Sequence, residues 1–380
     1  METNFGTSTP YSVGIEEELQ LVDPDSLELV SRIEPILATA GGETIRERVA
    51  PELLQSMLEV TTRIAVTVEE AVDEIVDLRS RLGRIAADHG VALAAAGTHP
   101  FSRCDAQRVT ERPRYTELAD SLGWLVSRQP VFGLHVHVGA GSAAKAIACA
   151  DGLRNHVPEL LALAANSPLR HGRPTGHAST RATILEDLPR TGLPPALESF
   201  ETFEAFVELG VRTGCFPDYT HIWWDVRPHP RLGTVEMRIC DAQTHVSSVA
   251  AIAALVQSLA ATVGSSFECG DLAPAGSAIV LEENRRRAAR FGLEARLIDL
   301  EDDTERPAAD AIRALVERCA PAADALGCAE ELELVEQILV CGNGADEQLR
   351  VFDETADAHA VVRRLVEQTT GEPAPPALQI

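Results

Sequence analysis

Tyr11-Ser-Val-Gly-Ile-Glu-Glu-Glu-Leu-Gln-Leu-Val22 alternates apolar and polar side chains with the period of a β-strand. One face of this predicted strand carries Val13, Ile15, Leu19 and Leu21, and the other carries Gly14, Glu16, Glu18 and Gln20. Like charges on one strand face repel, so Glu16 and Glu18 indicate either a solvated face or a site for a divalent cation or an arginine. We expect Glu17, which points to the apolar side, to be a structural pairing residue.

Other predicted strands repeat this arrangement of one apolar and one ionisable face. The ionisable groups are Glu59 in Met57–Thr61, His135 and His137 in Gly133–Gly139, Asp225 and Arg227 in Trp223–Arg227, and Glu236 and Arg238 in Thr234–Asp241. Taken singly, these are as readily core histidines or a surface ion pair. Together they predict a sheet whose concave face binds a metal and an anion, with helices covering the opposite face.

The residue types on this face narrow the chemistry. Three or more carboxylates with one imidazole suit Mg²⁺ or Mn²⁺ better than structural Zn²⁺, because no cysteine is placed to complete a zinc site. Arginines bind phosphates and carboxylates through paired hydrogen bonds. Metal, phosphate and carboxylate together indicate ATP-dependent activation of an acid. The sequence has no P-loop or G-x-G-x-x-G motif to hold the phosphates, and no G-x-S-x-G motif of an α/β-hydrolase.

The rest of the chain is organised as one α+β domain over residues 11–368, with a flexible N-terminus at 1–10 and a disordered tail at 369–380. A capping box formed by Thr67 and Glu70 predicts a long helix that ends near Gly90. Pro158 divides the helical region Ser142–Ala165 into two. From Val246 to about Gln368 the pattern is almost entirely helical.

Composition excludes several partners. Of the 380 residues, 33 are Lys or Arg and 58 are Asp or Glu, a net charge of −25, which argues against nucleic acid and anionic membranes. The eight cysteines contain no C-x-x-C pair and are typical of a reduced, cytoplasmic protein. The apolar stretch Val249–Val263 is too short to span a bilayer and predicts a buried helix. We expect small-molecule substrates, and the helical C-terminal half offers apolar surface enough for a homodimer.

An ordered set of motifs resembles the carboxylate–amine ligase family, also called glutamate–cysteine ligase type 2. The motifs are Gly14–Pro24, Met57–Thr62, Gly97–Phe101, Gly133–Gly139, Leu163–Pro168, Trp223–Pro228, Thr234–Asp241 and Glu283–Gly292. The resemblance implies a glutamine-synthetase-like fold, an antiparallel sheet curved around ATP and Mg²⁺ ions. It also implies the reaction: ATP converts a carboxylate to an acyl phosphate, and an amine then displaces phosphate to form an amide, as in joining glutamate and cysteine to γ-glutamylcysteine.

The resemblance also implies roles for single residues. The metal ligands would be Glu16, Glu18, Glu59, His135 and Glu236. Arg238 would contact the transferring γ-phosphate and act with Glu236 in catalysis. Arg181 and Arg227 would hold the amino-acid carboxylate or the phosphates, and His137 would be a further ligand or support the ligands.

Three other hypotheses stay open from the sequence. A guanidino-type or other small-molecule kinase of the same superfold would leave a phosphorylated product and no amide. A metal-dependent amidohydrolase built on His135, His137 and the glutamates would act without ATP. A binding protein with a decayed site is disfavoured, because the ionisable residues are intact.

Overall fold

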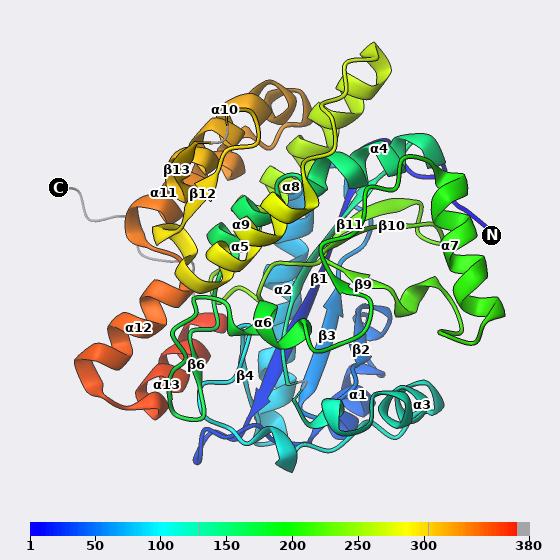
Figure 1. The fold of residues 1–380 in the computed structure, drawn as a ribbon. Helices are drawn as coiled ribbons and strands as arrows, with labels where there is room; N and C mark the ends of the chain where they lie inside the picture. The colour runs from blue at the N-terminus through cyan, green and yellow to red at the C-terminus, as the bar shows by residue number, and fades with distance from the viewer. Residues whose placement is uncertain (129, 303, 371–380) are drawn as a thin grey trace.

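Strand β1 (Val13–Val22) lies at the centre of the main sheet. The structure is a computed structural model, and it describes residues 1–128, 130–302 and 304–370 (Figure 1). Within these residues the strand order is β10-β11-β5-β1-β3-β2, with β4 also paired to β1, and every pairing is antiparallel. The other strands are β2 (Val49–Pro51), β3 (Met57–Thr61), β4 (Ala92–Ala94), β5 (Leu134–Gly139), β10 (Val226–His229) and β11 (Thr234–Met237). The mainly antiparallel α+β fold is therefore confirmed.

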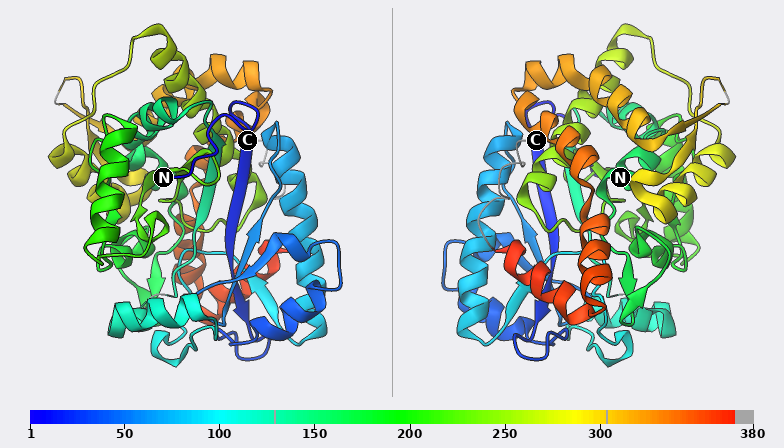
Figure 2. Two further views of the ribbon diagram at one scale, coloured as in Figure 1. Left: turned by 90° about the vertical axis from the view of Figure 1, so that its right-hand side faces the viewer. Right: turned by 90° about the vertical axis from the view of Figure 1, so that its left-hand side faces the viewer.

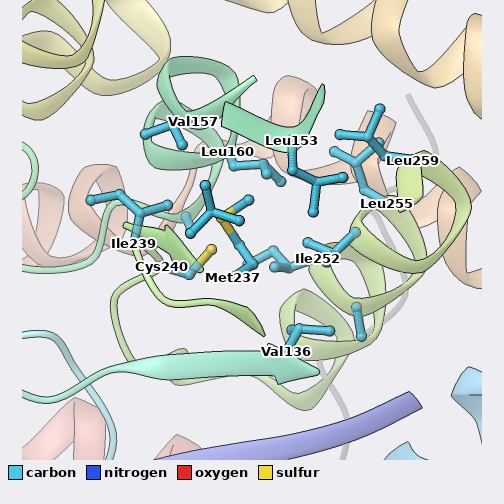
Figure 3. Close-up of a cluster of buried hydrophobic side chains, with 14 of the residues drawn as sticks. Val136, Leu153, Val157, Leu160, Met237, Ile239, Cys240, Ile252, Leu255 and Leu259 are labelled. Atoms are coloured by element: carbon cyan, nitrogen blue, oxygen red, sulfur yellow. The ribbon is translucent and has the colours of Figure 1, made fainter. Parts of the chain in front are cut away.

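Helices close the apolar face of this sheet. They are α2 (Val68–Asp88), α4 (Ala143–Arg154), α5 (Val157–Ala164) and α8 (Val246–Cys269). Figure 3 shows Val136 of β5 and Met237 of β11 turned toward Leu153, Leu160 and Ile252 from three of these helices. Because alternate residues point to opposite faces, this burial turns the even-numbered residues of β1 and β11 away from the core.

Local signals fix the ends of two of these helices. The side chain of Thr67 accepts a hydrogen bond from the Glu70 amide, and the Glu70 carboxylate accepts one from the Thr67 amide. Pro158 lies in the first turn of α5, where its missing N–H costs nothing. Both predictions are confirmed.

Helix α8 is longer than the apolar stretch that predicted it. Its 24 residues are long and apolar enough to cross a membrane, but 72% of its most apolar segment is buried inside the protein. It packs against α2, α4, α10 and α11. The helix is the central core helix, as expected from its composition.

The C-terminal part is helical, with one interruption that the sequence pattern did not predict. Its helices are α9 (Ala278–Phe291), α10 (Ala308–Leu326), α11 (Ala329–Cys341), α12 (Gly344–Thr355) and α13 (Ala358–Thr369). A hairpin of β12 (Arg296–Ile298) and β13 (Glu305–Pro307) separates α9 from α10. These strands have three residues each, too short for a periodic pattern.

Helix α13 returns to the main sheet. Its Val362 and Leu365 pack with Val22 and Ala94, and the Thr369 hydroxyl accepts a hydrogen bond from the Ala95 amide at 2.9 Å. Thr369 ends the helix and is buried, so the helix runs one residue past the expected end at Gln368. Residues 371–380, for which we expected disorder, lie outside the described part of the chain.

The N-terminal segment, for which we expected flexibility, makes backbone hydrogen bonds along the edge of the sheet. The amide of Asn4 donates to the carbonyl of Pro230, and the amide of Gly6 donates to that of Ala140, each at 2.9 Å. Figures 1 and 2 show the chain starting beside α7 (Phe200–Arg212). The segment thus joins the end of β5 to the turn between β10 and β11.

The expected strand Trp223–Arg227 is not continuous. Residues Tyr219–His221 form a 3-10 turn, and β9 (Trp223–Trp224) pairs in parallel with β8 (Thr191–Gly192) rather than with the main sheet. The remaining short elements are α1 (Ile33–Ala40), α3 (Pro113–Leu122), α6 (Thr180–Leu185), β6 (Leu169–Arg170) and β7 (Arg173–Pro174). Asp225 therefore lies between two strands that belong to different sheets.

Candidate active site

The side chains of the three consecutive glutamates of β1 point to both faces of the sheet. Glu16 and Glu18 lie on the face opposite the apolar core and are half-buried. Glu17 is buried behind them and accepts two hydrogen bonds from Arg79 of α2, Nε to Oε2 at 2.9 Å and Nη2 to Oε1 at 2.7 Å. Its expected pairing role is confirmed, and the ion pair fixes the register of β1 from behind.

Strand register brings the ionisable groups together. Glu16 lies opposite His135 on β5, and Glu18 lies opposite Glu59 on β3. On the other side of β5, Glu236 of β11 lies opposite His137, and Arg227 of β10 lies opposite Glu236. Four neighbouring strand pairs thus present their mid-strand side chains on one face.

A first group of possible ligands consists of Glu16, His137 and Glu236, which place one donor atom each within 4.8 Å of one another. Nε2 of His137 lies 3.2 Å from Oε1 of Glu16 and 3.8 Å from Oε1 of Glu236. Nδ1 of His135 lies 3.3 Å from Oε2 of Glu16, on the edge of the same group. His137 therefore lies closer to this centre than His135 does. The sequence analysis named His135 as the metal ligand and His137 only as a further ligand or a supporting residue.

Charge in this first group is balanced by its neighbours. Burial alone raises the pKa of Glu236, but Arg227, Arg238 and His137 hold this pKa well below its usual range. Burial also opposes ionisation of Glu16, and His137 together with a hydrogen bond from His135 keeps its pKa well below normal. Burial and Arg238 lower the pKa of His135 to about 4, which leaves this imidazole neutral and able to bind a metal.

A second group consists of Glu18, Glu52 and Glu59, and here the charges are not balanced. Burial and the charge of Glu18 raise the pKa of Glu52 to about 7. Burial and the charges of Glu16, Glu52 and Glu18 raise the pKa of Glu59 well above its normal value. Crowded carboxylates of this kind are stabilised when a divalent cation lies among them.

The donor set fits divalent cations. Nε2 of His135 is buried and has no hydrogen-bond partner among the described residues, and the buried Nε2 of His137 faces the carboxylates of Glu16 and Glu236. Carboxylate oxygens with few imidazoles are the ligands of Mg²⁺ and Mn²⁺. Each of the eight cysteines lies in the described part of the chain and is unpaired, and none is in either group.

Three arginines surround these groups. Arg238 bonds to Oε1 of Glu236, and Arg227 donates from Nε to Oε2 of the same carboxylate at 2.6 Å. Arg227 also donates from Nη1 to the carbonyls of Ile222 and Thr220, which occupies most of its guanidinium. Arg181 of α6 donates to the carbonyls of Ile239 and Arg238 and keeps its buried Nε without a partner among the described residues.

A cavity of about 110 Å³ opens beside these charges. Its polar wall consists of Glu18, Glu52, His135, Arg181, Asp225 and Arg238. Asp225 accepts two hydrogen bonds from Arg285 of α9, from Nε at 2.6 Å and from Nη2 at 3.3 Å. The chain thus brings a residue from its C-terminal third into contact with the wall of the site.

The sequence-predicted residues converge, and two contributors, Glu52 and Arg285, were missed. Glu16, Glu18, Glu59, His135, Glu236, Arg238, Arg227 and Arg181 all lie around the two groups and the cavity. Glu52, which follows Pro51 at the end of a three-residue strand, showed no alternation that marks a site. Arg285 was one arginine among several on a helix, and Asp225 was predicted on the ionisable face beside Arg227 but without a role of its own. Their contacts depend on tertiary structure.

Comparisons with known proteins agree on one family. The model of "Glutamate-cysteine ligase family 2 (GCS2)" matches residues 12–368. A Rubrobacter xylanophilus protein named "Putative glutamate--cysteine ligase 2-1" is 44% identical over 380 residues, covering 98% of this chain and 100% of that protein. A "Putative glutamate--cysteine ligase 2" of Solibacter usitatus is 39% identical over 358 residues, covering 94% of this chain and 93% of that protein.

Solved structures agree on the fold. The crystal structure of a glutamate–cysteine ligase from Francisella tularensis in complex with AMP superposes with a TM-score of 0.68 at 14% identity, covering 97% of this chain and 91% of that chain. A bifunctional glutathione synthetase from Pasteurella multocida gives the same TM-score at 16% identity, covering 95% of this chain and 52% of that chain. These likenesses establish the architecture around the ionisable face.

Proposed function

Because the chain belongs to glutamate–cysteine ligase family 2 and is an ATP-dependent ligase of that type, we propose that the face formed by β10, β11, β5, β1 and β3 is its active site. The proposed reaction joins the side-chain carboxylate of L-glutamate to the amine of L-cysteine or a related amino acid. The observation that carries the proposal is the juxtaposition of two carboxylate groups, two imidazoles and Arg238 on this one face.

The proposed chemistry proceeds in two steps. A carboxylate oxygen of the acid attacks the γ-phosphorus of ATP, and ADP leaves, so that an acyl phosphate forms. The amine nitrogen then attacks the acyl carbon, loses a proton and expels inorganic phosphate, which leaves an amide. We also propose that the main sheet curves around the triphosphate of ATP.

Arg238 stabilises the charge that develops on the transferring phosphoryl group. Its guanidinium is already oriented by Glu236, and the transition state therefore needs little reorganisation. Arg227 holds the other oxygen of Glu236. Arg181, which lines the cavity, would hold the amino-acid carboxylate or the phosphates.

Mg²⁺, or Mn²⁺ in its place, would neutralise the phosphate oxygens when bound. Glu16, Glu236 and a histidine, His135 or His137, would hold one ion, and Glu18, Glu52 and Glu59 would hold another. Both groups lie within the reach of Arg238, whose charge acts on Glu18, Glu52, Glu59 and His135.

ADP release measures this function directly. Pure protein with ATP, Mg²⁺ and glutamate is expected to release ADP faster when cysteine or another amino acid is added, with an amide detected by mass spectrometry. Glu236→Gln should lower turnover by at least about a hundredfold. The control Glu268→Gln, at an exposed glutamate of α8, should keep wild-type turnover.

Two outcomes would count against the proposal. A phosphorylated product without an amide identifies a kinase, and amide cleavage without ATP identifies a hydrolase. ADP release that no added acid or amine stimulates contradicts ligase activity altogether.

A cytoplasmic location and a homodimer also belong to the proposal. The unpaired state of the eight cysteines supports a reducing compartment. Fractionation of the native cells tests the location, and light scattering of the pure protein gives its mass against the 40.8 kDa of one chain.

A further inference from the structure

We infer that Asp241 is a positioning residue of the proposed ligase, and that it fixes α6 against the end of β11 so that Arg181 stays beside Arg238. The inference rests on the proposed function, which gives Arg181 and Arg238 their roles toward the substrates. Asp241 is not one of the described residues that line the cavity, so it acts through Arg181.

The carboxylate of Asp241 is fully buried, and three donors hold it. Its Oδ2 accepts hydrogen bonds from the amide of Asn166 at 2.8 Å and from the hydroxyl of Ser167 at 2.7 Å. Its Oδ1 accepts a hydrogen bond from the hydroxyl of Ser179 at 2.9 Å and lies 3.9 Å from Nη1 of Arg181. Loss of any of these bonds leaves a buried polar group without its partner, so the carboxylate fixes the segments that carry the donors.

The two serines place the start of α6. Ser179 is the N-cap of this helix, and its Oγ accepts a hydrogen bond from the amide of Ala182 at 3.2 Å. Oγ of Ser167 accepts a hydrogen bond from the amide of Arg181 at 3.1 Å. Both hydroxyls also donate to Asp241, so the carboxylate determines where the backbone of Arg181 lies.

The guanidinium of Arg181 returns the network to the segment that carries Asp241. Its Nη2 donates to the carbonyl of Arg238 at 3.1 Å, and its Nη1 donates to the carbonyl of Ile239 at 2.9 Å. The chain thus leaves β11 with Arg238, and three residues later Asp241 holds the helix whose arginine binds the Arg238 carbonyl. A shift of Arg181 therefore also releases the backbone of the residue proposed to contact the γ-phosphate.

Two glycines leave the space that this network occupies. A Cβ atom at Gly133 would lie 2.4 Å from Nη2 of Arg181, and a Cβ atom at Gly97 would lie 2.5 Å from Cγ of Asp241. Both distances are shorter than van der Waals contact, so any other residue at either position displaces the network. The carboxylate and the guanidinium are therefore packed closely at both ends.

A double-mutant cycle tests the inference. Asp241→Asn keeps the shape of the side chain but replaces one accepting oxygen with a donor, so at least one of the three hydrogen bonds is lost. ADP release is measured with cysteine and Mg²⁺ saturating while ATP and glutamate are varied in turn. The proteins compared are wild type, Asp241→Asn, Arg181→Met and the double variant.

We expect Asp241→Asn to lower kcat/KM at least about tenfold, and for the same substrate, ATP or glutamate, that Arg181→Met affects. In the Arg181→Met background the same change should lower kcat/KM less than about twofold, because two residues that act through one contact are not additive. A residue with a merely structural role would give the same loss in both backgrounds.

A matched control lies on the helix that covers the other face of the sheet. The carboxylate of Asp151 on α4 accepts hydrogen bonds from the amides of Leu197 at 2.8 Å and Glu198 at 3.0 Å. Asp151→Asn should lower Tm and leave kcat/KM unchanged. If Asp241→Asn does not fold, Ser167→Ala takes its place in the cycle, since it removes one hydrogen bond to Asp241 and the acceptor of the Arg181 amide.

The results separate this inference from the proposed function. An equal loss of kcat/KM in the two backgrounds, or wild-type kcat/KM in Arg181→Met or in both Asp241→Asn and Ser167→Ala, overturns the inference and leaves the ligase intact. Absence of amine-stimulated ADP release in the wild-type protein overturns the proposed function and the inference with it. A loss that requires Arg181 supports both.

Discussion

Arg79 of α2 and Glu17 of β1 form an ion pair that is buried directly behind the proposed active site, with exposed fractions of 2% and 1%. Arg79 also donates to the backbone carbonyls of Gln243, Thr244 and Thr369. A single guanidinium therefore connects β1, the segment after β11 and the end of α13. The position of Glu16 and Glu18 on the front face depends on this anchor behind them.

Replacing Arg79 with methionine should destabilise the fold strongly. The change leaves the Glu17 carboxylate buried without a partner, which costs about 3–5 kcal/mol in comparable pairs. Urea denaturation gives the free energy of unfolding. Arg81→Met, which removes a more exposed pair with Glu43, should cost about 1 kcal/mol or less. Equal losses in the two variants contradict the anchoring role.

Replacing Arg285 with methionine should weaken amine binding more than it slows phosphoryl transfer. Asp225 then loses both of its side-chain hydrogen bonds and no longer holds its position on the cavity wall. We expect the KM for the amine to rise about tenfold, with a smaller change in the glutamate-dependent ADP release that occurs without amine. Arg286→Met, at an exposed neighbour whose guanidinium bonds Glu283 on the same helix, is the matched control. If Arg285→Met and Arg286→Met change the KM for the amine equally, Arg285 does not position Asp225.

Replacing Glu59 with glutamine should stabilise the metal-free protein and weaken its binding of Mg²⁺ and ATP. The carboxylates of Glu18, Glu52 and Glu59 repel one another when they are ionised. Removing one of them should therefore raise the free energy of unfolding by on the order of 1 kcal/mol in the absence of metal. The same change removes a ligand, so the rise in Tm on adding Mg²⁺ and ATP should shrink. Thermal unfolding with EDTA and then with Mg²⁺–ATP measures both effects. Glu208→Gln, at an exposed residue of α7, should show neither, and a lowered Tm for Glu59→Gln in EDTA would argue against charge crowding.

His99 should make folding stability depend on pH. Burial lowers the pKa of this imidazole from 6.5 to about 3, and its Nδ1 accepts the Ser102 amide at 3.0 Å, which requires the neutral form. The unfolded chain binds the proton more tightly, so this contribution is complete above pH 6.5 and is lost as pH falls toward 3. At pH 5 the loss is about 2 kcal/mol.

The measurement is the free energy of unfolding at pH 7.5 and pH 5 for wild type and for His99→Asn. The difference between the two pH values should be smaller by about 2 kcal/mol in the variant. His89→Asn, at a half-exposed histidine, should behave like wild type. An unchanged difference in His99→Asn shows that His99 is not the group that titrates.

The period of the hydrophobic pattern and the helix-capping residues explain which features could be predicted from the sequence. The strict alternation in Val13–Val22 determines which glutamates face the site, because one residue of slip would exchange Glu17 for its neighbours. The capping box at Thr67 and the proline at position 158 mark helix boundaries by local chemistry. Glu16, Glu18, His135 and Glu236 were predicted to share one face because they lie in the middle of strands, where an ionisable side chain is unexpected.

The residues that were missed lie where local pattern carries no information. Glu52 follows a proline in a short irregular segment, and β9 pairs with two residues of a distant loop rather than with its sequence neighbours. The arginines of Arg285-Arg-Arg287 look alike in sequence. One of them is buried against Asp225, while Arg286 is largely exposed. Such distinctions arise only when remote segments meet.

The return of α13 to β4 has a consequence for how the protein matures in the cell. Ala95 and Arg79 obtain hydrogen-bond partners from Thr369, near the last of the described residues. During translation the early strands are synthesised long before this helix leaves the ribosome. Strands β1 and β4 therefore lack this support from behind until the segment around Thr369 has been synthesised and has packed against them.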